Sequence, residues 1–147
     1  MERLNGGCLC GRVRFSAKVA TDQAYACHSE VCRKGTGSAW TPLVHVMMED
    51  IHWQGKPDWY QMSPISHRPF CSNCGTSLGL AFVDDPTSVD LAVGIFDEPE
   101  RFRPAKNRSV ESMLPAWARL DELPAERTDE NEDMMRRLIA AGLVPQA

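Results

Sequence analysis

Four of the six cysteines in this 147-residue chain form two close pairs that lie far apart in the sequence. Cys8 and Cys10 are separated by one residue near the start, and Cys71 and Cys74 form a C-x-x-C motif near the middle. Zinc binds four thiolates at about 2.3 Å in a tetrahedron, and each close pair supplies two of them. The pattern predicts one structural zinc site whose metal contributes to folding. Disulfides and buried thiols are the alternatives for these residues.

The other two cysteines, Cys27 and Cys32, have no further pair of cysteines to complete a second four-thiolate site. Two cations, Arg33 and Lys34, follow directly, and cations lower the pKa of a neighbouring thiol and attract carboxylates. We therefore expect Cys32 to be the more reactive thiol. The alternative is a buried, inert cysteine beside two solvated cations. Residues 27–37 are expected to form a loop.

The elements that position these cysteines have the pattern of a small antiparallel β domain. Apolar and polar residues alternate over residues 13–19, which is typical of a half-buried strand. Further strands are expected at residues 39–48, 51–53, 59–62, at a segment that ends at residue 70, and at residues 77–83 and 89–95. Pro42 indicates that the strand over 39–48 lies at an edge or carries a bulge.

The C-terminal part predicts one amphipathic helix. Thr128 is the expected N-cap and Gly142 suits the position just after the helix. The apolar stripe is Met134, Met135, Leu138 and Ile139, and the expected i,i+4 ion pairs are Glu132–Arg136 and Asp133–Arg137. We expect a zinc-binding β domain over residues 1–125 and a helix within 126–147 that packs on the same domain.

Composition excludes several classes of partner. The chain has 16 basic and 20 acidic residues, a net charge of −4, and no long basic tract, so nucleic acid is not an expected partner. No apolar run is long enough to span a membrane, and the first residues do not form a signal peptide. Cysteines grouped for metal indicate a reducing cytoplasm.

The order of the cysteine motifs resembles the glutathione-dependent formaldehyde-activating enzyme family, which includes the centromere protein V-like proteins. The resemblance is carried by residues 7–15, 27–34 and 70–78, with a later match over 96–104 and through Trp117. It implies a mainly β fold of small stacked antiparallel sheets stapled by a structural zinc. That fold is similar to the methionine-R-sulfoxide reductases and the zinc chaperones of Rab GTPases.

The resemblance also implies roles for particular residues. In the family the two outer cysteine pairs hold the structural zinc. The matching residues here are Cys8, Cys10, Cys71 and Cys74. The family's middle motif, C-x-C-x-x-C, surrounds a second zinc, and the matching candidate catalytic residues here are Cys27, Ser29 and Cys32. A serine hydroxyl is a weak zinc ligand, so the second zinc is not expected to bind tightly. Neither His28 nor Glu30 is the expected replacement.

Two alternatives follow for the middle motif. Either a substrate thiol completes the coordination, or the two cysteines act as a thiol pair without metal. The implied activity is that of a carbon–sulfur lyase that forms or cleaves glutathione adducts of small aldehydes, such as S-(hydroxymethyl)glutathione. Arg33, Lys34 and Trp40 are the expected residues that bind the small thiol or aldehyde adduct, and Trp40 is expected to border the cleft.

A competing function is a non-catalytic, zinc-stapled binding module that lost the second metal site through Ser29. The number of zinc ions per chain separates the two. Methionine sulfoxide reduction is disfavoured because it needs a catalytic cysteine on a later strand, and no cysteine follows Cys74.

Overall fold

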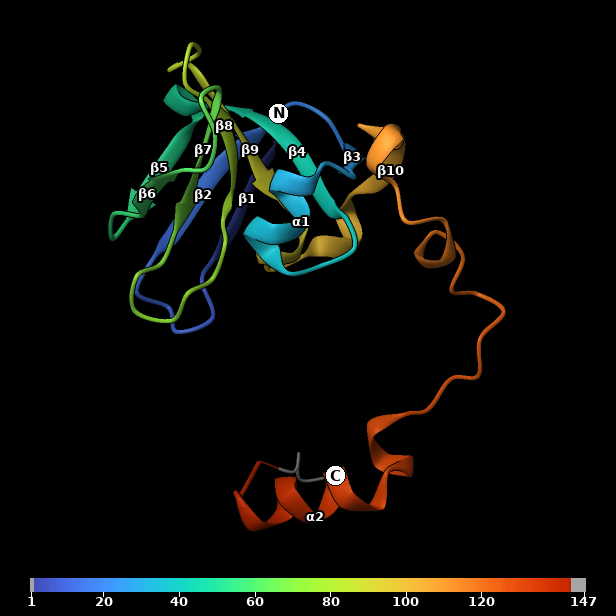
Figure 1. Cartoon of the computed structure of the whole chain (residues 1–147). Helices are drawn as coiled ribbons and strands as arrows, with labels where there is room; N and C mark the ends of the chain where they lie inside the picture. Colours follow the sequence, from blue (N-terminus) through green and yellow to red (C-terminus); the bar gives the residue numbers. More distant parts are fainter. Residues whose placement is uncertain (1, 144–147) are drawn as a thin grey trace. The chain divides into compact units, whose positions relative to one another are not determined.

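The computed structural model describes residues 2–143, and strands dominate its regular structure (Figure 1). The strands are β1 (Glu2–Gly7), β2 (Arg14–Val19), β3 (Gln23–Cys27), β4 (Thr41–Met47), β5 (Ile51–Gln54), β6 (Asp58–Gln61), β7 (Ser66–Phe70), β8 (Gly79–Phe82), β9 (Ser88–Ala92) and β10 (Arg103–Arg108). The α-helices in the described range are α1 (Glu30–Thr36) and α2 (Glu132–Ala140). Neither of these helices is long and apolar enough to cross a bilayer.

The strands form two sheets. One is three-stranded with the order β1-β2-β5, and the other is seven-stranded with the order β10-β3-β4-β9-β8-β7-β6. The predicted mainly β fold is therefore confirmed. All neighbouring strands pair antiparallel except β10, which returns after a long connection to pair in parallel with β3. The sequence analysis did not predict β1, β3 or β10.

A hydrophobic core lies between the inner faces of the two sheets. On β2, Phe15, Ala17 and Val19 are buried, which confirms the alternating pattern predicted over residues 13–19. They belong to one apolar cluster with Val44 and Val46 of the larger sheet. Burial of this apolar surface holds the two sheets together. It also determines which face of β4 points into the core, and the opposite face is left for other contacts.

One strand expectation is wrong. Pro42 lies in β4, an inner strand between β3 and β9, and pairs in regular register with Ala26. It is the second residue of its strand, where the missing N–H interrupts little of the ladder. The turn at residues 55–58 lies between β5, which pairs with β2, and β6, which pairs with β7. It carries the chain from one sheet to the other.

The chain divides into two compact units, Met1–Leu114 and Pro115–Ala147. In the second unit, α2 begins after Asn131, whose side chain accepts a hydrogen bond from the Met134 N–H at 2.9 Å. The N-cap is therefore not Thr128, which lies in a preceding turn of 3-10 helix. Gly142 follows the helix with φ 68°, as predicted. Packing of α2 on the β domain stays a prediction.

The ion pairs of α2 also differ from expectation. Arg136 contacts Asp133 at 2.8 Å, an i,i+3 pair, in place of the two expected i,i+4 pairs. Both spacings bring side chains together on one helix face, so local rotamers decide between them.

Candidate functional site

The structure brings the four outer cysteines together. The sulfur atoms of Cys8, Cys10, Cys71 and Cys74 all lie within 4.8 Å of one another. The Cys8 and Cys10 sulfurs are 3.5 Å apart, and those of Cys10 and Cys71 are 3.8 Å apart. In a tetrahedron with metal–sulfur bonds of about 2.3 Å the sulfurs are about 3.8 Å apart. This cluster can hold a metal ion.

Each cysteine pair lies on a tight backbone turn. The Gly11 N–H donates to the Cys8 carbonyl at 3.1 Å, and the Gly75 N–H donates to the Cys71 carbonyl at 2.7 Å. Both glycines have φ near 80°, in the left-handed region that a side chain disfavours. The two turns therefore depend on glycine to aim their paired sulfurs at one point.

Hydrogen bonds favour the thiolate form of Cys8 and Cys74 in this cluster, whereas the pKa of Cys71 is raised. Burial raises the pKa of Cys8, but a hydrogen bond from the Val13 N–H and contacts with neighbouring thiols outweigh burial and lower it. The hydroxyl and the backbone N–H of Thr76 lower the pKa of Cys74 to about 5. The Asn73 amide donates to the Cys10 sulfur at 3.3 Å. These donors suit a metal-binding set, since the thiolate is the form that binds metal.

The middle motif does not form a loop, because α1 begins directly after Ser29. The Ser29 hydroxyl accepts a hydrogen bond from the Cys32 N–H at 3.1 Å and so caps the helix. Glu30 and Lys34 form an i,i+4 ion pair at 3.0 Å, and Gly37 ends the helix with φ 79°. These helix signals were present in the sequence, but we interpreted the same residues only as candidate catalytic and binding residues.

Cys27 and Cys32 form a buried thiol pair at the start of α1. Cys27 is 6% and Cys32 5% exposed, and the two belong to one buried cluster. The Cys27 sulfur also lies 3.3 Å from the Ser29 hydroxyl. Ser29 thus occupies the centre of the motif as a helix cap and as a polar neighbour of Cys27.

The acidities of the two thiols are the reverse of the expected order. The hydrogen bond with Cys32 lowers the pKa of Cys27, and contacts with the Ser29 hydroxyl, its backbone N–H and the charge of His28 lower it further. The same hydrogen bond and burial raise the pKa of Cys32. Lys34, one of the two cations that were expected to activate Cys32, is paired with Glu30.

The middle motif has no third metal ligand. Within residues 2–143, the four outer cysteines are the one group in which three or more ligand atoms converge. His28 is buried, and its Nε2 lies 2.9 Å from the Asn107 side-chain oxygen. Glu30 is exposed and paired with Lys34. Two thiols beside a serine that caps a helix do not fit a three-thiolate zinc site.

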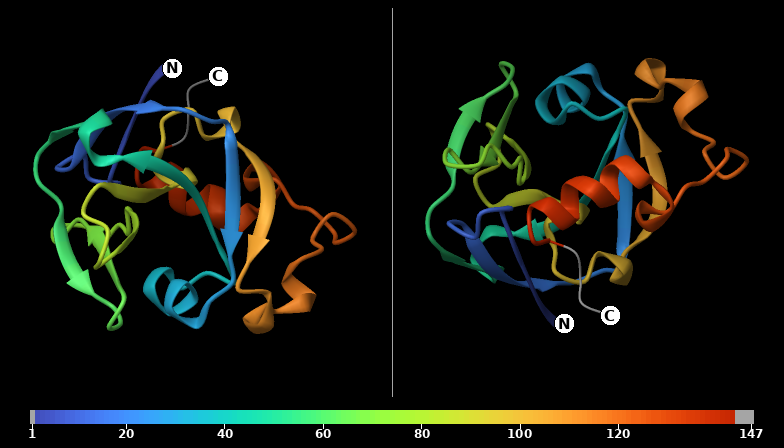
Figure 2. Two further views of the ribbon diagram at one scale, coloured as in Figure 1. Left: turned by 90° about the horizontal axis from the view of Figure 1, so that it is seen from above. Right: turned by 90° about the horizontal axis from the view of Figure 1, so that it is seen from below.

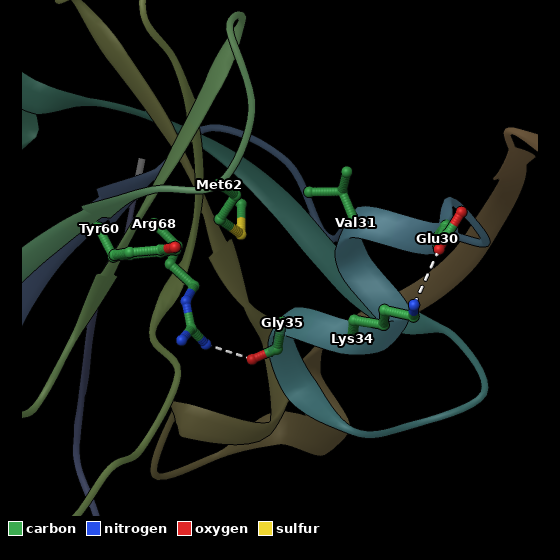
Figure 3. A pocket seen from close by; sticks show the side chains of 7 residues that line it. All are labelled: Glu30, Val31, Lys34, Gly35, Tyr60, Met62 and Arg68. Carbon is green, nitrogen blue, oxygen red and sulfur yellow. Dashed lines mark hydrogen bonds and ion pairs between the residues drawn. The ribbon is translucent and has the colours of Figure 1, made fainter.

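A cleft of about 290 Å³ lies between α1 and the β6–β7 hairpin (Figure 3). Its lining residues are Glu30, Val31, Lys34, Gly35, Tyr60, Met62 and Arg68. A narrow inner pocket shares Gly35, Met62 and Arg68 with this cleft and reaches Cys32. The inner pocket is only about 10 Å³ in volume, so the cleft approaches Cys32 through the three residues that the two share. The wall of the cleft opposite α1 was not predicted from the sequence, because no local sequence pattern indicates that residues 60–68 lie beside the helix.

Arg68 ties the far wall of the cleft to α1. Its guanidinium donates to the Gly35 carbonyl, as the dashed line in Figure 3 shows. The guanidinium carbon also lies 5.9 Å from the centre of the Tyr60 ring and 5.6 Å from that of Phe70. Both distances are within the range of cation–π attraction.

The residues that were expected to bind the substrate do not all line this cleft. Lys34 lines the cleft. Trp40 lies beside the buried His28, with ring centres 6.5 Å apart. The cleft that the structure describes is bordered by Tyr60 and Met62 on the side opposite α1.

Comparison with known proteins agrees with the motif order and the geometry. The sequence model of the glutathione-dependent formaldehyde-activating enzyme family matches residues 3–112. The chain belongs to this family. The match spans both cysteine turns, the thiol pair and β10, and it ends two residues before the boundary of the first compact unit.

Two known proteins are similar to this chain. An "uncharacterized lyase" of Schizosaccharomyces pombe is 27% identical over 84 residues, which are 57% of this chain and 61% of that protein. The match thus spans about three-fifths of the relative's length. A crystal structure of a Rhodobacter sphaeroides protein superposes with a TM-score of 0.57 and 19% identity, covering 71% of this chain and 99% of that one. At that identity the likeness concerns the fold alone.

Proposed function

We propose that the protein is a carbon–sulfur lyase that forms or cleaves adducts of a small aldehyde with a thiol such as glutathione, S-(hydroxymethyl)glutathione being the simplest. The observation that carries this proposal is the buried pair Cys27–Cys32, with Cys32 lining the inner pocket beside the cleft, in a chain of this family. The name of the yeast relative supports the lyase class.

In the proposed reaction the two cysteines move one proton. Cys32 faces the cleft through the inner pocket, and Cys27 is the thiol whose anion is stabilised. As the carbon–sulfur bond of a hydroxymethyl thioether breaks, its electron pair leaves with the substrate sulfur. The hydroxyl oxygen forms the aldehyde carbonyl, and its proton passes to Cys32 while the Cys32 proton moves to Cys27. Adduct formation is the reverse of these steps.

The cleft lining fits the thiol-bearing partner. Arg68 and Lys34 are the cations of the cleft, and Glu30 balances the charge of Lys34. Substrate carboxylates are therefore expected near Arg68, while Met62 and Tyr60 provide apolar surface for the carbon chain.

We further propose that the metal of the outer four-cysteine cluster is zinc. When bound, zinc closes this site with four thiolates and stabilises the fold, with no open position for chemistry. The six cysteines are all free thiols in the described structure, and we propose a reducing, cytoplasmic setting for the protein.

The competing proposal is a binding module that uses the cleft without catalysis. The specific observation in its favour is Ser29, whose hydroxyl caps α1 and leaves the middle motif with two thiols. Both proposals share the structural zinc and the cleft.

The experiment is exchange NMR of ¹³C-formaldehyde with glutathione, in the presence of the zinc-loaded full chain. The lyase proposal expects the adduct to exchange faster than the spontaneous rate. It also expects the variants Cys27→Ala and Cys32→Ala to lose that acceleration, while Lys56→Gln, an exposed change outside the cleft, retains it. If the folded wild type gives no acceleration but binds glutathione, the lyase proposal fails and the binding module stands.

A further inference from the structure

A second pocket lies at the other end of the seven-stranded sheet, between β10, β3, β4 and β9. Its volume is about 220 Å³, and its polar lining includes Tyr25, His45, Asp90, Lys106 and Arg108. These residues are not part of the cleft that leads to Cys32. Figure 2 shows β3 and β10 side by side in both views.

A buried carboxylate organises the floor of this pocket. Asp90 is 7% exposed, and both of its oxygens are occupied. The Tyr25 hydroxyl donates to one, and His45 Nδ1 lies 2.8 Å from the other. Burial and the Asp90 charge raise the pKa of Tyr25, so the phenol stays protonated as a donor. Each oxygen of Asp90 therefore already has a partner inside the protein.

Lys106 and Arg108 are the uncompensated charges of the pocket. The Arg108 guanidinium carbon lies 4.2 Å from the centre of the Tyr25 ring, within the range of cation–π attraction. The third basic residue of β10, Arg103, pairs with Asp22 at 3.1 Å. Neither Lys106 nor Arg108 has an ion-pair partner among residues 2–143.

A bulge in β10 turns both cations to the pocket side. In the parallel ladder Pro104 pairs with Ala24, but Lys106 pairs with Tyr25, so Ala105 is the extra residue. Without the bulge, Lys106 would align with Ala26 and face the opposite side of the sheet, because successive side chains alternate. Bulges often re-aim side chains next to functional sites, and they are rare in parallel pairs.

We propose that this pocket binds a small organic anion, with its carboxylate or phosphate oxygens held by Lys106 and Arg108 over the Tyr25–Asp90–His45 network. Two cations without ion-pair partners and one carboxylate give the pocket a net charge near +1 with His45 neutral, which favours an anion. The volume suits a molecule of metabolite size, smaller than the ligands of typical drug pockets. Tyr25 also packs against the cluster that contains Cys27 and Cys32, but anion binding here can be tested without reference to the proposed thiol chemistry.

The test is calorimetric titration of the full chain, zinc-loaded and in a chloride buffer, with succinate in one arm and glycerol 3-phosphate in the other. The proposal expects one-to-one binding of at least one probe. Lys106→Gln and Arg108→Gln should each weaken binding by about tenfold or more, because each removes a charge-assisted hydrogen bond. The matched control Arg103→Gln removes the same charge from the same strand and should leave binding unchanged.

A second measurement localises the ligand. In NMR spectra the bound probe should shift the imidazole signals of His45, while those of His52 and His67, which lie outside the pocket, stay in place. Binding of one probe alone identifies the carboxylate or the phosphate class. The proposal is overturned if neither probe binds at millimolar concentration, or if Arg103→Gln weakens binding as much as Arg108→Gln. If Arg108→Gln does not fold, the binding affinity of Lys106→Gln is compared with that of Arg103→Gln.

Discussion

At the scale of single residues, Ser29 decides the character of the middle motif. Its hydroxyl accepts from the Cys32 N–H and lies 3.3 Å from the Cys27 sulfur, so one side chain joins the helix cap to the thiol pair. A thiol at this position would cap the helix less well but would supply a third soft ligand. Helix stability and metal affinity therefore compete at one atom.

The variant Ser29→Cys should increase the zinc bound per chain by up to one ion, because it completes three thiolates. Plasma mass spectrometry on purified protein measures this number. The matched control Ser29→Ala should bind no additional zinc and should lose about 1 kcal/mol of stability with the cap. A wild-type protein that already binds two zinc ions tightly would contradict this expectation.

The acidity of Cys27 predicts a particular pH dependence. Its folded-state pKa is lowered by the hydrogen bond with Cys32, so alkylation of Cys27 should have a midpoint below the value of about 8.5 of a free thiol. The stability that the Cys27 thiolate contributes is complete above the unfolded pKa and is lost as pH falls through the folded one. Peptide mapping after alkylation at several pH values separates Cys27 from Cys32. A lower midpoint for Cys32 than for Cys27 would refute this order.

At the scale of elements, α1 has seven residues and depends on its neighbours for support. Short helices are marginal by themselves, and the cap at Ser29 satisfies only part of one end. The Arg68 guanidinium binds the Gly35 carbonyl near the other end, and this contact sets the distance between α1 and β7. This long-range hydrogen bond joins the two walls of the cleft, while Cys32 packs in the core beneath α1.

Arg68→Gln should lower the free energy of unfolding by about 1.5–3 kcal/mol, the usual contribution of a hydrogen bond with a charged partner. Hydrogen exchange at the amides of α1 should accelerate as well, because the helix loses its link to β7. Urea denaturation and exchange NMR measure the two effects, with Lys56→Gln as a surface control. Unchanged exchange in α1 would show that the helix is held by other contacts.

At the scale of the whole molecule, the four-cysteine cluster joins the turn after β1 to the turn after β7. The first turn belongs to the small sheet and the second to the large one, so a metal there fastens the two sheets to each other. Packing of the apolar core between the sheets also holds them together. Metal binding and folding of the first unit are therefore linked.

Cys71→Ser, or removal of metal with a strong chelator, should unfold the first unit or greatly lower its Tm, because the remaining thiols no longer close the site. Circular dichroism with a zinc-release dye follows both events. Ser72→Ala lies in the same turn, exposed and outside the ligand set, and should leave the Tm unchanged. A Cys71→Ser protein as stable as the wild type would show that the cluster is not a structural metal site.

Some features of this protein follow from the sequence alone because they depend on local chemistry. Two close cysteine pairs, each with a glycine in a tight turn, predict one four-sulfur cluster, and the structure has it. The alternation over residues 13–19 predicts a strand and its buried face, because side chains alternate along an extended backbone. The helix signals at Ser29 and Gly37 were equally local, but we interpreted that segment as a loop.

Other features were decided only by the tertiary structure, because they join residues far apart in the chain. The acidity of Cys27 depends on its position against Cys32 at the start of α1, and the two walls of the cleft are joined where Arg68 reaches Gly35. The anion pocket requires β10 to return parallel to β3 with a bulge, which no periodicity in residues 103–108 indicates. Sequence patterns reveal which face of a strand is apolar, but the strand that lies beside it is chosen by the packing of the whole sheet.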